Sequence, residues 1–276
     1  MIELWSLRDE ACAERLVNAE LQGDLADALL AIEGVEEDVR SEVVSLLEEW
    51  GRDVAKCVKG DGVEDSIDAL REILVDSLDF RGDSQRYYLE KNSYLSDVVE
   101  TKCGLPILLS AVWVIVGKYA GLQVEGVGMP GHFIIRVGGD GGQLVDPFRG
   151  GEILSVAECK GIYDKLFGHM RPWDSSLLEP VSISAILERV LQNLLNVFTK
   201  QKRLAPLYRT VRRLSILRPD VPEWLLNQGQ IAEFAGFVDV ALSAYQLFVE
   251  QFEGVPQSEH AKAKIVLLSQ KLNEMN

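Results

Sequence analysis

Hydrophobic and polar positions divide the chain into three stretches with different periods. From about Leu7 to Asp79 apolar residues recur three and four positions apart, which is typical of helices, and the pattern breaks at Gly51 and at Lys59–Gly62. From Phe80 to about Glu158 short apolar runs between turn residues indicate strands. Helical spacing returns at Ser182 and continues to the end of the chain. The pattern therefore predicts a helical region, a region that contains a sheet, and a second helical region.

A glycine-rich stretch in the middle of the chain predicts a hairpin of two short strands. The apolar run Phe133–Val137 is followed by a tight turn at residues 138–142 and by the run Gln143–Asp146. His132 begins the first strand and Asp146 ends the second, so we expect the two side chains to lie within hydrogen-bonding range. A carboxylate beside an imidazole fixes the tautomer of the imidazole and stabilises its charged form, as in a nucleophilic triad.

Each of these side chains also has a purely structural interpretation. His132 follows Met-Pro-Gly and can bond a carbonyl group of that loop. Asp146 precedes Pro147, and aspartate before proline commonly caps a turn with its own side chain. Ser110, a further hydroxyl in this part of the chain, lies in an apolar run, where a packing serine or a bond to its own helix is expected.

One long apolar run predicts a buried helix at the centre of the fold. Pro106 suits its first turn, where a missing N–H group costs nothing, and Gly121 suits its C-terminal stop. A helix that is apolar almost all round must be covered on most sides. The predicted fold class is therefore α+β, with the helix of residues 104–120 packed on a small antiparallel sheet.

Several motifs in this order resemble those of one family. The helix opening Gly-Leu-Pro-Ile, the run Val-Gly-Met-Pro-Gly-His-Phe and the run Val-Asp-Pro-Phe-Arg-Gly-Gly are similar to those of the SirB-type transglutaminase-like proteins of bacteria. The preceding segment is also similar, at Leu78–Gly82, at Tyr87 and Tyr88, and at Asn92–Leu95.

The resemblance implies a particular domain organisation. Residues 80–175 would form a transglutaminase-like (papain-like) core, and residues 1–79 a helical N-terminal region of the same core domain. Residues 182–276 would form a domain of tetratricopeptide-like helical repeats. The segment from Arg171 to Pro180 is the predicted linker between the core and the repeats.

The resemblance also implies where the catalytic residues would stand. In the wider superfamily a nucleophilic cysteine opens the central helix, usually as Gly-x-Cys, and His and Asp follow on successive strands. His132 and Asp146 match this order, whereas Pro106 stands where the cysteine belongs. We expect the rim of the cleft around the pair to be formed by Asn92, Ser93, Tyr94, Met129 and Phe148.

Cys103 is the remaining candidate nucleophile. It lies three residues before Pro106, at or just before the start of the predicted helix, where the helix dipole can acidify a thiol. Three residues of chain displace a group by up to about 10 Å, which is far outside a hydrogen bond to His132. The alternative interpretation is a small apolar residue that packs under a loop.

The last stretch predicts two degenerate helical pairs and a terminal helix, Ser258–Met275. A tetratricopeptide unit of about 34 residues places small residues at fixed offsets, so that its two helices approach closely. Gly229, Gly236, Ala241 and Tyr245 fall on such offsets.

Charge restricts the class of partner. The chain has 28 basic and 43 acidic residues and a net charge of -15, which repels phosphate backbones and anionic membranes. We therefore expect neither nucleic acid nor a membrane as partner. The basic cluster formed by Lys200–Arg203 with Arg209, Arg212 and Arg213 could receive an acidic partner, but it is more typical of a solvated helix face.

Cysteine spacing and apolar runs restrict cofactors and location. The four cysteines, Cys12, Cys57, Cys103 and Cys159, form no CxxC or Cys/His spacing, so we expect no metal, no other cofactor and no disulfide. The N-terminus has acidic residues where a signal peptide needs basic ones, and the longest apolar stretch, near Ile107–Val116, is too short to span a bilayer. These features predict a cytoplasmic protein.

Two classes of function fit the sequence. The first is a non-catalytic or catalytically reassigned transglutaminase-like protein that binds a protein or peptide, or regulates one, with an acidic surface suited to a basic partner. The alternative is a cysteine-dependent acyl-transfer or amide-hydrolysing enzyme that uses Cys103, His132 and Asp146. The missing Gly-x-Cys thiol favours the first class, and the retained His and Asp keep the second open.

Overall fold

The chain forms two compact units. The computed structural model describes residues 6–83, 89–168 and 171–275. We call Asn18–Val190 the core unit, and Met1–Val17 together with Leu191–Asn276 the helical unit. Tyr87 and Tyr88, which contribute to the family resemblance, lie outside the described residues.

The core unit begins with helices, as the apolar spacing predicts. They are α2 (Leu25–Glu33), α3 (Glu37–Cys57), α4 (Val63–Arg71) and the π-helical turn η1 (Glu72–Ser77). The Asp24 carboxylate caps the first helix by accepting a 3.0 Å bond from the N–H of Asp27, and Gly34 ends it in the left-handed region with φ 76°. The glycine-rich break predicted at residues 59–62 separates α3 from α4.

The break predicted at Gly51 is absent, because α3 runs straight through this residue. A Cβ atom at Gly51 would stand 2.3 Å from the Cβ atom of Tyr119, and real atoms do not approach so closely. The glycine therefore permits close packing against the end of α6 (Pro106–Tyr119).

The sheet of the core unit has four antiparallel strands, of which the sequence predicts the central two. They are β3 (Val124–Val127), β4 (Ile134–Val137), β5 (Gln143–Asp146) and β6 (Glu152–Leu154), in that spatial order. In the predicted hairpin β4 pairs with β5, with Ile135 opposite Val145. Glycines at the turn adopt positive φ, among them Gly138 at 95° and Gly141 at 78°.

The central helix begins later than expected. Cys103 and Gly104 are not helical but form strand β2 (Cys103–Gly104), which pairs in parallel with β1 (Arg81–Gly82). Helix α6 starts only at Pro106, whose missing N–H suits the first turn. Between these strands the chain forms η2 (Glu90–Ser93) and α5 (Leu95–Thr101).

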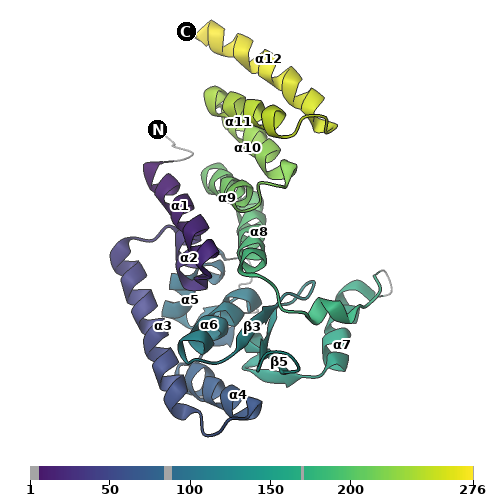
Figure 1. Ribbon diagram of the computed structural model, residues 1–276. Coiled ribbons are helices and arrows are strands. Elements are labelled where there is room, and N and C mark those ends of the chain that lie inside the picture. The colour runs from purple at the N-terminus through teal and green to yellow at the C-terminus, as the bar shows by residue number, and fades with distance from the viewer. Residues whose placement is uncertain (1–5, 84–88, 169–170, 276) are drawn as a thin grey trace. The chain divides into compact units, whose positions relative to one another are not determined.

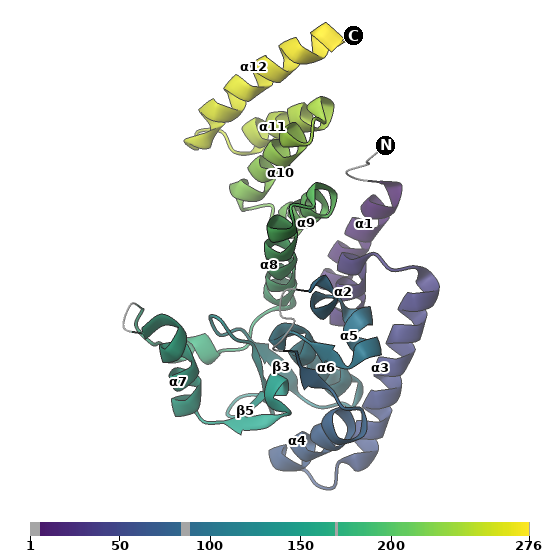
Figure 2. The same cartoon turned by 180° about the vertical axis from the view of Figure 1, so that it is seen from behind.

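Helix α6 lies at the centre of a layered arrangement. Figure 1 and Figure 2 show it between α3 and the sheet, and they show α7 (Val156–Phe167) on the far side of the sheet. Most of α6 is buried, including Trp113 with 0% exposure. The predicted packing of an apolar central helix on a small antiparallel sheet is confirmed.

The segment predicted as a linker is instead attached to the sheet. It contains the short 3-10 helix η5 (Ser175–Leu178) and the buried side chain of Leu178. The Leu178 carbonyl accepts a 3.0 Å bond from Nη2 of Arg136, and Pro180 forms a bridge with Val127 of β3. The edge of the sheet leaves unpaired backbone groups, which this segment satisfies.

The helical unit consists of successive helices. They are the first part of α1 (Leu7–Gln22), most of α8 (Ile183–Gln201), α9 (Leu204–Leu217), α10 (Pro222–Phe234), α11 (Val238–Gln251) and α12 (Gln257–Met275). Figure 1 shows α9, α10, α11 and α12 in this order, with neighbouring helices side by side.

The basic cluster on α9 is not a free solvated face. The Asp9 carboxylate of α1 lies 3.2 Å from the Arg209 guanidinium and 3.4 Å from that of Arg213, and Glu10 lies 3.2 Å from Arg212. Arg213 and Asp9 are both buried, so the pairing neutralises charge that packing has removed from water. The acidic partner of this cluster lies within the same chain.

Gly229 permits close packing of α10 against α11. A Cβ atom at this position would lie 2.7 to 2.9 Å from atoms of the Tyr245 ring. That ring is fully buried, and its hydroxyl donates a 3.0 Å bond to Glu233. Among the described residues, no helix is long and apolar enough to cross a membrane.

We predict that Gly229→Ala destabilises the helical unit. The buried Tyr245 ring has no room to move away from the new methyl group, and overpacking of this kind costs about 1–3 kcal/mol. Urea denaturation followed by circular dichroism measures the loss. Gln230→Ala, one position along on the exposed face of the same helix, is the control and should change the free energy of unfolding by less than about 0.5 kcal/mol. Equal effects of the two substitutions would contradict the packing argument.

Candidate functional site

His132 and Asp146 form a hydrogen-bonded pair at one end of the sheet. Nε2 of His132 lies 2.7 Å from Oδ2 of Asp146, within the range that the hairpin predicts. Ile135 is opposite Val145, so Asp146 lies level with the start of β4, close to the histidine that precedes this strand. The Asp146 side chain is fully buried, and 11% of the His132 side chain is exposed.

The Asp146 carboxylate has further partners besides the imidazole. Its Oδ1 accepts a 3.1 Å bond from the backbone N–H of Phe148, and Nε of Arg149 lies 3.4 Å from Oδ2. A buried carboxylate is tolerated only when its oxygens are paired, and these donors supply the pairing. Asp146 is also the N-cap residue of the 3-10 turn η3 (Pro147–Arg149). Its side chain therefore caps a turn, as the structural interpretation of this residue predicts.

Phe148 lies beside the pair. Its ring meets the His132 ring edge-on, with centroids 6.3 Å apart and an angle of 87° between the planes. The Phe148 ring also packs against Gly82 of β1, where an added Cβ atom would stand 2.5 Å from the ring. Of the five residues expected at the rim, Phe148 is the one whose side chain meets the His132 ring.

The loop that carries His132 is held by two side chains. The Met129 carbonyl accepts a 2.7 Å bond from Nη1 of Arg189 and a 3.2 Å bond from the backbone N–H of His132. Ser110 of α6 donates a 3.3 Å bond to the carbonyl of Phe133. Ser110 is therefore neither a nucleophile candidate nor bonded to its own helix, but ties the central helix to the start of β4.

Three of the other expected rim residues are buried. The Met129 side chain is 0% exposed and packs in an apolar cluster with Ile134 and Leu154, so only its carbonyl serves the loop. Asn92 is buried as well, and its carbonyl accepts a 3.2 Å bond from the N–H of Leu105, just before α6. Ser93 is also buried.

Asn92 and Ser93 lie behind the surface rather than on a rim. Nδ2 of Asn92 donates a 3.4 Å bond to Asp83, and the hydroxyl of Ser93 has no hydrogen-bond partner among the described residues. Tyr94, which is half-buried, supplies the N-terminal cap position of α5.

The Cys103 thiol is directed away from the pair. Arg81 is opposite Cys103 in the β1–β2 ladder, and Gly82 is opposite Gly104. Successive residues of a strand point to opposite faces, and Gly82 points toward Phe148. Cys103 therefore points to the other face, together with Arg81, whose pKa is raised chiefly by Asp79 and further by the Cys103 sulfur.

A second cysteine lies near Asp146, although no local sequence signal identified it. Cys159 of α7 is fully buried in the same apolar cluster as Met129. Burial, together with the neighbouring negative charge of Asp146, raises the pKa of the Cys159 thiol to about 11. This thiol is therefore protonated near neutral pH and is a poor nucleophile.

Sequence reasoning missed the residues that support the pair. Arg149 follows Asp146 by three positions, and Arg189 comes from a helix 57 positions after His132. The motif Asp-Pro-Phe-Arg could have identified Arg149 from the sequence, whereas no nearby motif connects Arg189 with the pair. Among the described residues, no group of three or more His, Cys, Asp or Glu side chains is arranged to hold a metal ion.

A central helix against an antiparallel sheet, with a His–Asp pair on successive strands, defines the class of transglutaminase-like folds. The sequence profile of the transglutaminase-like superfamily matches residues 35–192, and the chain belongs to this family. The match includes the central helix, the sheet and the His132–Asp146 pair.

Relatives of the chain occur in bacteria and in mammals. It is 31% identical to a UPF0162 protein of Xylella fastidiosa strain Temecula1 over 205 residues, which is 73% of each chain. It is 25% identical to a UPF0162 protein of Vibrio cholerae over 69% of this chain and 71% of that protein. F-box only protein 21 of the mouse is 29% identical over 60% of this chain, which is 27% of its own length. No solved structure matches the chain.

We predict that Cys159 resists alkylation in the folded protein. Its thiol is buried and its pKa is raised to about 11, so almost no thiolate is present at pH 7.5. Iodoacetamide treatment followed by mass spectrometry should leave Cys159 unmodified until urea unfolds the protein. Cys12 and Cys57, which are partly exposed, are the internal controls. Modification of Cys159 at the rate of these two would show that α7 opens easily.

Proposed function

We propose that this protein is a transglutaminase-like protein that has given up thiol chemistry and acts as a protein- or peptide-binding or regulatory module. The observation that carries the proposal is the direction of Cys103, which shares a face with Arg81 and not with Phe148 and the histidine. An imidazole activates a thiol only at hydrogen-bond distance. Pro106, at the start of the central helix, supplies no nucleophile in its place.

The retained pair is suited to binding a hydrogen-bond donor. Because Nε2 of His132 is engaged by Asp146, Nδ1 is left as the acceptor of the neutral ring. The exposed part of the ring is small, so a partner group that reaches it is largely removed from water. An amide N–H or an ammonium group of a partner fits this acceptor.

The distribution of charge supports a basic partner. The core unit contains 31 acidic and 16 basic residues, so the entire net charge of -15 lies in it. Such a field attracts basic segments of a protein and repels nucleic acid and anionic membranes. The proposed ligand is therefore a basic protein segment, bound without a cofactor.

We also assign the chain to the SirB-type branch, with tetratricopeptide-like pairs in the helical unit. Supporting observations are the packing of α9 on α10 and of α10 on α11, neighbours along the chain, and the close approach at Gly229. In mouse F-box only protein 21 the matching region is about a quarter of a longer chain, which is consistent with a module that operates beside other parts.

The second candidate is a cysteine-dependent acyl-transfer or amide-hydrolysing enzyme that uses Cys103, His132 and Asp146. It is favoured by one observation, the 2.7 Å contact between the imidazole and a fully buried carboxylate. For catalysis the β1–β2 ladder would have to rearrange so that Cys103 turned to the face of Phe148.

Partner capture separates the two functions. We expect immobilised wild type and Cys103→Ser to retain the same basic proteins from a cell extract, and His132→Ala to lose about tenfold or more of them, because a hydrogen bond to a charged group is worth about 1.5–3 kcal/mol. Quantitative mass spectrometry of the bound fractions measures this. His260→Ala, an exposed histidine of α12, is the matched control. If Cys103→Ser instead abolished an amide-cleaving or amide-transferring activity of the wild type, the enzyme function would replace the binding function.

Alkylation kinetics test the same point without a partner. We expect iodoacetamide to modify Cys103 no faster than a model thiol at pH 7.5, and at an equal rate in wild type and in His132→Ala, because the thiol points away from the imidazole. The rate is measured by following the Cys103 peptide in a time course. Fast modification that disappears in His132→Ala would reveal an activated cysteine.

A further inference from the structure

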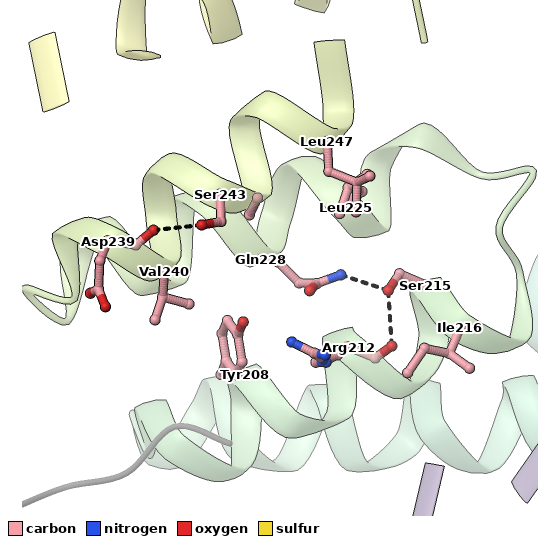
Figure 3. A pocket seen from close by; sticks show the side chains of 11 residues that line it. Tyr208, Arg212, Ser215, Ile216, Leu225, Gln228, Asp239, Val240, Ser243 and Leu247 are labelled. Atoms are coloured by element: carbon pink, nitrogen blue, oxygen red, sulfur yellow. Dashed lines mark hydrogen bonds between the residues drawn. The ribbon is translucent and has the colours of Figure 1, made fainter. Parts of the chain in front are cut away.

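A groove in the helical unit has two side-chain groups, one hydroxyl and one amide oxygen, that form no hydrogen bond with the residues that the structure describes. A cavity of about 410 Å³ lies between α9, α10 and α11, and its polar end is lined by Tyr208, Arg212 and Gln228. Figure 3 shows these three side chains pointing toward one another across the open space. A cavity of this size falls in the range of specific ligand sites, about 300–1,000 Å³.

Two of these polar groups lack partners on the side that faces the cavity. Tyr208 is only 1% exposed, yet its hydroxyl forms no hydrogen bond with any described residue. Gln228 is 5% exposed and donates a 2.6 Å bond from Nε2 to Ser215, while its Oε1 accepts none within the described part of the chain. Both side chains are more than nine-tenths buried and face the cavity, so a ligand that fills it can pair this hydroxyl and this amide oxygen in place of water.

The groove continues into an apolar end. A second cavity of about 180 Å³ shares Leu225 and Leu247 with the first and is closed by Val221 and Phe252. Leu247 is 41% exposed, so a ligand can reach it from solvent. The groove therefore combines hydrogen-bonding groups at one end with room for a large apolar side chain at the other.

The charge of the helical unit argues against a charged ligand. Its acidic and basic residues are equal in number, 12 of each, so it exerts no net attraction on either sign. Two charged side chains line the cavity, Arg212 and Asp239, so the charge of its lining is balanced as well, and Arg212 is already paired with Glu10 of α1 at 3.2 Å. The proposed basic partner of the core unit is thus a poor match for this groove.

We propose that the groove binds an extended, uncharged peptide segment of a partner protein. One carbonyl group of the peptide accepts a hydrogen bond from the Tyr208 hydroxyl, and a neighbouring N–H donates to Oε1 of Gln228. A large apolar side chain further along occupies the space between Val221, Leu247 and Phe252. An extended chain is required because a helical peptide has already used its backbone groups and would leave Tyr208 and Gln228 unpaired.

This site contains neither residue of the His132–Asp146 pair, so it is tested separately from the proposed function. A display library of random twelve-residue peptides is selected against the full-length wild-type protein, and the enriched peptides are synthesised. We expect sequences with two or more large apolar residues and no net charge. Their dissociation constants, measured by fluorescence anisotropy, should change less than about twofold between 50 and 500 mM NaCl, because no ion pair forms.

Two substitutions locate the bound peptide. Tyr208→Phe removes only a hydroxyl without a partner, so the fold is retained, and affinity should fall about three- to tenfold, the effect of one neutral hydrogen bond. Leu247→Glu places a charge at the apolar end and should weaken binding at least about tenfold. Leu267→Glu, an exposed leucine of α12 outside the groove, should bind as wild type does, and so should His132→Ala.

Several results would overturn the proposal. One is a selection that enriches no peptide on the wild-type protein, and another is enrichment of basic peptides with strongly salt-dependent affinity. A third is an affinity that Tyr208→Phe and Leu247→Glu both leave unchanged, because the peptide would then bind elsewhere. Loss of binding in His132→Ala would assign the peptide to the core unit and would also refute the groove.

Discussion

Helix α6 is buried over most of its length, and the rest of the core unit is built around that constraint. Eleven of its fourteen residues are buried, so both of its sides need a covering layer. Helix α3 supplies one layer, and its Gly51 allows the two helices to meet closely; the four-stranded sheet supplies the other. Each large apolar side chain removed from water contributes about 1.5–3 kcal/mol, so this packing stabilises the unit strongly. Ser110, the polar residue in the middle of the helix, bonds the strand that follows His132 and so links the core to the site.

The buried carboxylate of Asp146 is the second constraint, and it changes how the His–Asp pair is interpreted. Asp146 caps a turn through the N–H of Phe148 and pairs with Arg149 as well as with His132. It therefore has structural partners that are independent of any nucleophile. These contacts are sufficient to hold the buried carboxylate in place, so the pair by itself does not establish catalysis. Burial, with a further contribution from the same carboxylate, raises the pKa of the Cys159 thiol and so suppresses its reactivity.

The two units differ in the surface that they offer. The core unit carries the whole net negative charge of the chain, whereas the helical unit is balanced and keeps its basic α9 side chains paired with Asp9 and Glu10. Salt weakens the long-range attraction that the charge of the core unit exerts. It has little effect on the apolar contacts and hydrogen bonds proposed for the helical unit. The proposed surfaces of the chain therefore select different chemical classes of segment.

The amino-acid sequence alone determined the features that depend on local pattern. The buried central helix, the hairpin and the 2.7 Å approach of His132 to Asp146 all follow from apolar period, turn glycines and short separation along the chain. Only the tertiary structure decided which way Cys103 points, because that depends on pairing with Arg81, a residue 22 positions earlier. It also decided that Gly51 is a packing contact and that Arg212 pairs with a residue 202 positions away. Local periodicity records which side of an element is apolar, whereas these contacts depend on which distant elements share a surface, and no short window of sequence contains both partners.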